Sequence, residues 1–239
     1  MNAWNPWHGC HKISPGCKNC YMHRRDDSIG IDGNIVRKTK SFDLPVKRDK
    51  EGKYKLQPQG ELFTCGTSDF FVEEADEWRQ QAWQIMKERA DIDFLILTKR
   101  IHRFAECLPP DWGDGYDNVR IGCTVENQDR ADYRLPIFLA TPIKRRAIIC
   151  EPILEELDLS PYLQKGKVDE VVAGGESGWE ARPCRYEWIL KLQQQCVGAG
   201  VGFWFKQTGR YFIKDGKQYT VLKRYQHAQA RKAGINHKP

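Results

Sequence analysis

Short apolar segments alternate with longer amphipathic segments along the chain, and this alternation predicts the fold class. Six apolar runs have the length of β-strands, and a weaker seventh precedes Cys10. They cover residues 3–8 (the weak one), 61–66, 93–97, 119–123, 146–150, 170–174 and 202–205. Strands that alternate with helices indicate βαβ units and a parallel sheet, and nearly continuous apolar strands fit a sheet buried on both faces.

The segments between these runs predict two helices and one hairpin. Residues 76–90 place Trp78, Ala82, Ile85 and Met86 on one face, and Asp76 is a suitable N-cap. Residues 185–199 repeat the pattern with Trp188, Leu192 and Cys196, and Gly200 is expected to end that helix. Residues 212–222 form a predicted β-hairpin with Asp215-Gly216 at its turn. We expect residues 29–60 to be an irregular excursion or hairpin, and the last fifteen residues to be loose.

Composition and charge narrow the class of protein. At 239 residues one large domain over residues 1–209 is expected, followed by a C-terminal hairpin and basic tail at 210–239. There is no secretory signal and no apolar window long enough for a membrane span, so the cytoplasm is the expected location. The net charge of +6 mildly favours an anionic partner such as a nucleotide or nucleic acid.

Polar side chains follow most of the apolar runs. In a parallel α/β fold these positions share the carboxyl end of the sheet, where ligands bind. We therefore predict that one cavity collects Asp69, Thr98, Glu126, Glu151, Glu176 and Lys206. The glutamates could contact a cofactor, act as acid–base groups, or form ion pairs with Lys99, Arg100 or Lys206. Lys99 and Arg100 are candidates for holding an anionic substrate.

Three cysteines, Cys10, Cys17 and Cys20, lie within eleven residues. A disulfide framework is excluded because nine cysteines is an odd number and a chain of this length in a reducing cytosol needs no such staple. Three thiolates on one loop can hold three corners of a 4Fe–4S cluster and leave the fourth iron open. A Cys3His zinc site that includes His8, His11 or His23 is the alternative. The absence of a second Cys-x-x-Cys pair favours iron–sulfur. Cys65, Cys123 and Cys150 lie in apolar strands and are expected to be small core residues.

Several motifs together carry a resemblance to a known family. They are WNPWHGCHKISPGCKNCYM, FLILTKR, IGCTVENQ, ICEPI, VAGGESG and GFWFKQTG, in this order over residues 2–209. With them the chain resembles a phage- and prophage-associated three-cysteine family of unassigned function, which in turn resembles radical S-adenosylmethionine enzymes.

The resemblance implies a full or partial (β/α) TIM-like barrel. It implies that Cys10, Cys17 and Cys20 ligate a 4Fe–4S cluster, whose open iron chelates S-adenosylmethionine. It also implies a flavodoxin- or ferredoxin-type reductant and a 5′-deoxyadenosyl radical that modifies an unidentified substrate.

The chain departs from that family in two places. The first gap between cysteines has six residues rather than three, and CGTSD stands where Gly-Gly-Glu often follows the second strand. The Gly-Gly-Glu-Ser sequence occurs instead at 174–177. A longer loop is tolerated at small entropic cost. These departures therefore argue less against the predicted cluster than against the predicted S-adenosylmethionine site. The competing hypothesis is a non-catalytic binding protein stabilised by zinc or an iron–sulfur cluster.

Overall fold

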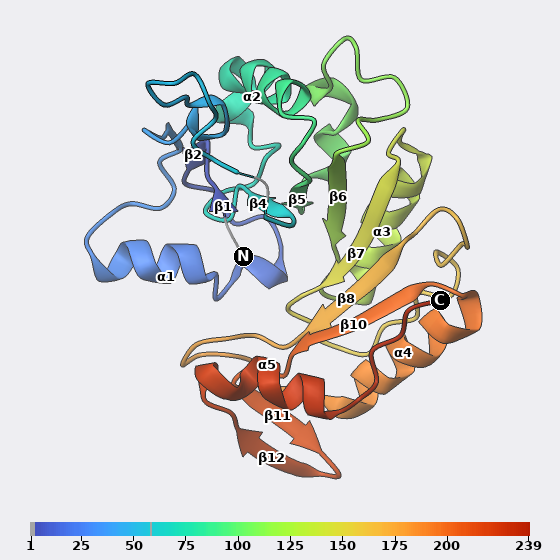
Figure 1. Cartoon of the computed structure of the whole chain (residues 1–239). Coiled ribbons are helices and arrows are strands. Elements are labelled where there is room, and N and C mark those ends of the chain that lie inside the picture. Colours follow the sequence, from blue (N-terminus) through green and yellow to red (C-terminus); the bar gives the residue numbers. More distant parts are fainter. Residues whose placement is uncertain (1–2, 58) are drawn as a thin grey trace. The chain divides into compact units, whose positions relative to one another are not determined.

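The main element of the computed structural model, which describes residues 3–57 and 59–239, is a seven-stranded parallel sheet. The strand order is β1-β4-β5-β6-β7-β8-β10 (Figure 1). The bounds are β1 Ala3–Trp4, β4 Leu62–Thr64, β5 Phe94–Thr98, β6 Val119–Thr124, β7 Arg145–Cys150, β8 Glu170–Gly174 and β10 Gly202–Gln207. The α/β class and the six strong predicted strands are therefore confirmed.

Five helices accompany the sheet within the described residues. They are α1 (Tyr21–Ser28), α2 (Asp76–Glu88), α3 (Gln128–Ala140), α4 (Tyr186–Ala199) and α5 (Lys223–Lys232). The two predicted helices are confirmed as α2 and α4, and Gly200 ends α4 in the left-handed region at φ 64°. The prediction that Asp76 caps α2 is wrong. A 3₁₀ turn, Glu73–Ala75, leads into the helix, so Ala75 is the N-cap and the Asp76 carboxylate accepts hydrogen bonds from Arg79 and Arg103.

The chain divides into two compact units. The first comprises Met1–Lys12, Met22–Gly122 and Thr141–Arg145, and the second comprises Ile13–Tyr21, Cys123–Ala140 and Arg146–Pro239. The division falls inside β6, so the carboxyl end of this strand belongs to the second unit. The segment Ile13–Tyr21, which carries Cys17 and Cys20, also belongs to the second unit, whereas Cys10 belongs to the first.

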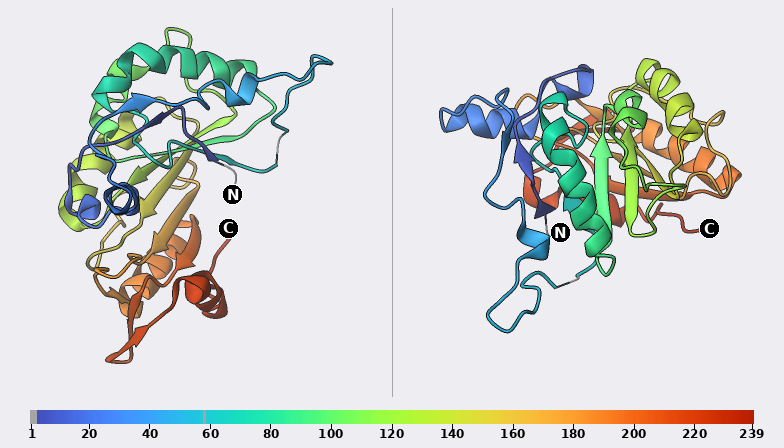
Figure 2. Two further views of the ribbon diagram at one scale, coloured as in Figure 1. Left: turned by 90° about the vertical axis from the view of Figure 1, so that its left-hand side faces the viewer. Right: turned by 90° about the horizontal axis from the view of Figure 1, so that it is seen from above.

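Aromatic packing forms the core of the first unit. Helix α2 runs beside the strands of this unit (Figure 2), and its Trp83 ring lies 4.7 Å from that of Phe70 and 5.0 Å from that of Trp112. Trp4 and Trp7 are fully buried and belong to this core. The predicted strand 3–8 is instead two strands, since β2 (Trp7–His8) leaves the main sheet and pairs with β3 (Arg37–Lys38). Between β1 and β2 stands Pro6, which has no N–H to give to a strand ladder.

The region 29–60 is irregular, as predicted. Its described residues include β3, a short 3₁₀ turn at Leu44–Val46 and an isolated antiparallel bridge between Arg48 and Tyr54.

In the second unit β7 pairs with β8 and β8 with β10, all in parallel. Helix α4 packs on β8 and β10, and α5 packs on β10. The predicted hairpin is confirmed as β11 (Tyr211–Lys214) and β12 (Lys217–Thr220), and the positive φ of Asp215 (52°) and Gly216 (71°) suits its two-residue turn. Strand β11 also pairs with the short β9 (Cys184–Arg185).

The prediction of a loose C-terminal tail is wrong. Residues 223–232 form α5, which buries Gln226 and Ala230, and the Gln226 side chain donates a hydrogen bond to the Val221 carbonyl. Beyond the helix, His237 and Phe203 exchange backbone hydrogen bonds. The tail is therefore held by packing and by hydrogen bonds, which its basic composition did not indicate.

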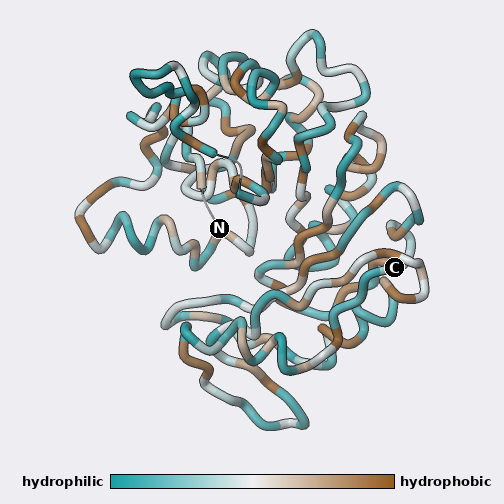
Figure 3. Tube along the Cα trace, viewed as in Figure 1, coloured by the Kyte–Doolittle hydropathy of each residue, from teal (hydrophilic) through white to brown (hydrophobic). Residues whose placement is uncertain are grey.

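The helices differ in hydropathy along the trace. Helix α1, with the sequence YMHRRDDS, is mostly hydrophilic (Figure 3). Within the described residues, none of the helices combines the length and the apolar character needed to cross a bilayer.

Candidate functional site

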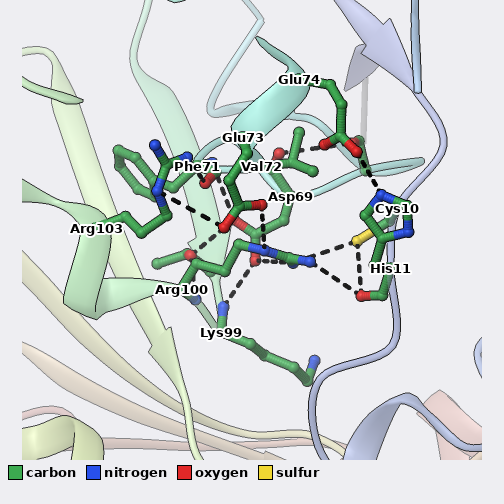
Figure 4. Close-up of polar contacts among 12 residues, drawn as sticks. Cys10, His11, Asp69, Phe71, Val72, Glu73, Glu74, Lys99, Arg100 and Arg103 are labelled. Atoms are coloured by element: carbon green, nitrogen blue, oxygen red, sulfur yellow. Dashed lines mark hydrogen bonds and ion pairs between the residues drawn. The ribbon is translucent and has the colours of Figure 1, made fainter. Parts of the chain in front are cut away.

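In the first unit, Cys10 lies against a buried arginine (Figure 4). The Arg100 side chain is only 3% exposed, and its guanidinium donates to Cys10 Sγ at 3.4 Å and to the His11 carbonyl at 3.1 Å. Burial opposes its charge, but Asp69 and Cys10 outweigh burial and raise the pKa of Arg100. A fixed positive charge beside a sulfur favours the thiolate, which is the form that binds metals.

Asp69 holds this arginine and the end of β5 together. Its carboxylate accepts hydrogen bonds from Thr98 Oγ1 (2.8 Å) and the Lys99 amide (2.9 Å), and it lies 3.6 Å from Arg100 Nη1. Thr98 Oγ1 in turn accepts a hydrogen bond from the Arg100 amide at 2.8 Å. The predicted neighbours Asp69 and Thr98 are thus in direct contact. The Lys99 side chain extends away from the Asp69 carboxylate (Figure 4).

The backbone around Cys10 requires a glycine. Gly9 has φ +97°, and a Cβ there would lie 2.3 Å from the Ile35 carbonyl oxygen. The close approach lets the Cys10 amide donate to the Gly33 carbonyl at 2.9 Å. Gly9 itself is held by Ser68, whose hydroxyl donates to its carbonyl at 2.5 Å. Residues from three distant parts of the sequence therefore fix the position of Cys10.

In the second unit, a buried glutamate binds the loop that carries Cys17 and Cys20. Glu126 Oε1 accepts a hydrogen bond from the Gly16 amide at 2.9 Å, and Glu126 Oε2 pairs with Arg134 Nη1 at 2.8 Å. The side chains of Glu126 and Arg134 are 0% and 1% exposed. A Cβ on Gly16 would lie 3.0 Å from the Glu126 carboxyl carbon, so this contact also favours glycine.

Glu176 holds the same loop at a second point. Its carboxylate accepts hydrogen bonds from Asn19 Nδ2 at 3.1 Å and from Arg182 at 2.9 and 2.6 Å. Burial opposes ionisation, but the hydrogen bonds from Arg182 and Asn19 outweigh it and lower the pKa of Glu176. This carboxylate is therefore ionised at neutral pH.

The third glutamate, Glu151, lies among polar groups that are partly accessible. Lys206 Nζ donates to Glu151 Oε2 at 2.6 Å and Gln207 Nε2 donates to Glu151 Oε1 at 2.5 Å. The side chains of Lys206 and Glu151 keep 30% and 15% of their surface exposed.

Exposure distinguishes the three loop cysteines from the other six. All nine are free thiols, but only Cys10, Cys17 and Cys20 are partly exposed. The other six are buried: Cys65, Cys107, Cys123, Cys150, Cys184 and Cys196. Burial raises the pKa of the Cys65 and Cys150 thiols, so these groups stay neutral and inert. The predicted core placement of Cys65, Cys123 and Cys150 is confirmed.

The family model described as "Protein of unknown function (DUF5131)" matches residues 1–236. The chain belongs to the DUF5131 family. No curated protein and no solved structure matches this DUF5131 chain.

The predicted ligands of the DUF5131 chain are divided between its two units. Among the described residues, no group of three or more His, Cys, Asp or Glu side chains surrounds a point that could hold a metal ion. Of the histidines considered for zinc, His8 contacts Asp26 at 2.6 Å and His11 contacts Glu74 at 2.5 Å. Both Nε2 atoms are therefore already hydrogen-bonded.

The predicted polar residues form two groups, one in each unit. In the first unit, Asp69, Thr98 and Arg100 are in direct contact with one another. In the second, the carboxyl ends of β6, β7, β8 and β10 carry Glu126, Glu151, Glu176 and Lys206. That the two groups share one cavity stays a prediction.

Sequence reasoning missed the partners of the glutamates. Arg134 lies on α3, a helix that the apolar pattern did not indicate, and Arg182 lies in the segment between β8 and β9. Asn19 was not among the predicted site residues. The one available signal was chemical: a carboxylate as buried as Glu126 needs a cation nearby.

Proposed function

We propose that this protein is a radical S-adenosylmethionine enzyme whose three partly exposed cysteines, Cys10, Cys17 and Cys20, hold a 4Fe–4S cluster. The observation that carries the proposal is the exposure pattern, since these three thiols are accessible and the other six are buried. The donor set fits the group because cluster-binding thiolates gain from hydrogen bonds to sulfur, and Arg100 supplies one to Cys10. Closure of the strands into a full or partial TIM-like barrel belongs to the same proposal.

A bound 4Fe–4S cluster supplies an electron and an open iron site, the chemistry needed to cleave the sulfonium of S-adenosylmethionine. The chain's own residues hold the ligands in place. Arg100 offsets negative charge at Cys10. In the loop that carries the other two cysteines, Glu126 holds the backbone through the Gly16 amide, and Glu176 holds the Asn19 side chain.

The structure supports different roles for the three glutamates. Glu126 is fully buried in an ion pair, and Glu176 is held ionised by Arg182, so we assign both to positioning rather than to the predicted acid–base chemistry. Asp69 and Thr98 are also buried and hydrogen-bonded to each other. Glu151 and Lys206 are more accessible, and we propose that they contact the amino, carboxylate or hydroxyl groups of S-adenosylmethionine. The expected substrate class is a nucleotide or nucleic acid.

The test uses protein purified without oxygen. We expect it to be brown, with iron and sulfide in excess of zinc, and to form 5′-deoxyadenosine when mixed with dithionite and S-adenosylmethionine. Dithionite replaces the flavodoxin- or ferredoxin-type reductant. Glu151→Gln should reduce the rate of formation about tenfold or more without changing the iron content, because it removes a positioned charge at nearly constant volume.

A matched control for this prediction is Glu155→Gln, since Glu155 is exposed and follows the same strand end. Colourless protein that contains zinc, with no binding of S-adenosylmethionine by titration calorimetry, would replace the enzyme by the zinc-stabilised binding protein.

Replacing Arg100 by Met is expected to weaken retention of the cluster. The change removes the donor to Cys10 Sγ, and loss of such outer-shell partners costs about 10–100-fold in metal affinity. The measurement is the rate at which a chelator bleaches the visible absorption of the anaerobic protein.

Arg100→Lys should give an intermediate rate, because lysine keeps the charge but loses the fork geometry. Arg103→Met serves as the control, since Arg103 bonds the Phe71 carbonyl and Asp76 instead of a cysteine. Equal bleaching rates in all the variants would contradict a role for Arg100 at the cluster.

A further inference from the structure

A groove in the second unit lies between the hairpin β11–β12 and helix α5, which are neighbours at the C-terminal end of the chain (Figure 1). Its volume is about 750 Å³, within the range of ligand sites. Five aromatic rings line it, each from a different element: Tyr186, Phe205, Phe212, Tyr219 and Tyr225. Phe205 is buried, whereas Tyr219 and Tyr225 remain 44% and 47% exposed. The groove therefore offers flat, accessible aromatic faces.

Cations accompany these rings. Lys214 and Lys232 line the groove, and Lys214 Nζ lies 5.1 Å from the centre of the Tyr186 ring. Lys217 lies 5.3 Å from the Tyr219 ring, and the Arg224 guanidinium lies 4.8 Å from the Tyr225 ring. None of the residues lining the groove is acidic.

The charge of the chain is concentrated around this groove. Residues 210–239 contain eight Lys or Arg and a single acidic residue, Asp215. Their net charge of +7 exceeds the +6 of the whole chain, so residues 1–209 are slightly acidic. The positive surface thus belongs to the hairpin, α5 and the end of the chain, and it complements a polyanion.

We propose that this groove binds single-stranded nucleic acid, with bases stacked on Tyr219 and Tyr225 and phosphates at Lys214 and Lys232. Aromatic platforms combined with a basic groove are the usual means of binding single strands, because every base has a face that can stack. A duplex keeps its bases stacked on one another and cannot use the rings. An acidic peptide would use the lysines but has no regular series of planar groups for the tyrosines.

This inference goes beyond the proposed function and is independent of it, because it concerns a surface formed by residues 186–233 and requires neither cluster nor cofactor. The probes are fluorescein-labelled dT12, rU12 and a DNA hairpin duplex, measured by anisotropy between 50 and 200 mM KCl. We expect dT12, rU12 or both to bind more tightly than the duplex. Binding of one alone shows that the groove distinguishes DNA from RNA.

Two double variants separate stacking from charge. Tyr219→Ala/Tyr225→Ala should weaken binding at least tenfold, whereas Tyr219→Phe/Tyr225→Phe keeps the rings and should bind normally. Tyr133→Ala removes a similarly exposed ring from α3 and should change nothing. Lys214→Ala/Lys232→Ala should reduce the slope of log K against log salt by about 1.4, because two single-strand phosphate contacts are lost. Lys144→Ala/Lys191→Ala is the control, since those lysines pair with Asp117 and Glu156.

Three results would overturn the proposal. One is the absence of binding to both single strands at 50 mM KCl. The second is binding that neither double variant changes, because the contact would then lie on another surface. The third is competition by a twelve-residue polyglutamate peptide as strong as that by unlabelled dT12, which would identify an acidic protein as the partner. All the substituted side chains are exposed, so the melting temperature of each variant should stay close to that of the unmodified protein.

Discussion

Replacing any one of Cys10, Cys17 or Cys20 by Ala is expected to abolish the iron–sulfur absorption of the anaerobic protein. A cluster that three thiolates hold loses a corner with each substitution, and the protein offers no accessible fourth thiol to replace it, since the other six are buried. We expect the iron content to fall below a tenth of that of the unmodified chain, and formation of 5′-deoxyadenosine to fall with it.

The matched controls are Cys65→Ala in the first unit and Cys150→Ala in the second. Each makes the same chemical change at a buried thiol whose pKa burial raises, so neither should alter the absorption. Full iron loading in any one of the three loop variants would show that the ligand assignment is wrong. Zinc bound to the unmodified protein in place of iron, and lost in all three variants, would retain the ligands and exclude the radical mechanism.

The sequence predicted the sheet because strands that are buried on both faces consist almost entirely of apolar residues. Runs such as 119–123 and 146–150 are apolar nearly throughout, and each corresponds to a strand within one residue at either end. The carboxyl-end positions followed from the same pattern, since parallel strands end at one edge.

Elements stabilised by a few specific contacts were not predictable in this way. Helix α3 contains Pro136, a residue that argues against a helix interior, and α1 is largely charged, so the sequence pattern indicated neither helix. Helix α5 buries only a glutamine and an alanine among its ten residues. Its basic composition suggested a solvated tail, and the backbone hydrogen bonds that His237 exchanges with Phe203 beyond the helix join residues far apart in the sequence.

The contacts of the candidate site depended on such distant pairs. The residue types at the strand ends were visible, but nothing local shows that Glu126 contacts Gly16, which lies 110 residues earlier. Similarly, Arg100 was expected at a strand end facing a substrate, whereas its guanidinium contacts Cys10. Three-dimensional packing decides which carboxylates are accessible and which hold the backbone, and this distinction separates Glu151 from Glu126 and Glu176.

Replacing Glu126 by Gln is expected to lower the free energy of unfolding by about 3–5 kcal/mol, the usual cost of removing one partner from a buried ion pair. Arg134 would keep its charge at 1% exposure, with the Thr124 carbonyl still accepting a hydrogen bond from its Nη1 atom but without the carboxylate. The shape of the side chain hardly changes, so a cavity does not explain the loss. Urea unfolding of the metal-free protein measures it.

The control is Glu156→Gln, which breaks the exposed pair with Lys191, where about half of each side chain is accessible. Exposed pairs contribute about 0–1 kcal/mol, so its unfolding midpoint should hardly move. A second variant, Glu126→Leu with Arg134→Met, removes both charges and should regain part of the stability, because the cost arises from the unpaired cation.

The reactivity of Cys17 tests whether Glu126 also holds the cysteine loop in place, beyond its contribution to stability. In Glu126→Gln the glutamine oxygen can still accept from the Gly16 amide, whereas leucine cannot. Alkylation of Cys17 under native conditions should therefore be faster in the double variant than in Glu126→Gln, even though the double variant is the more stable of the two. Equal alkylation rates would show that Glu126 does not hold the cysteine loop, and a loss below about 1 kcal/mol in Glu126→Gln would show that the pair is not buried in solution.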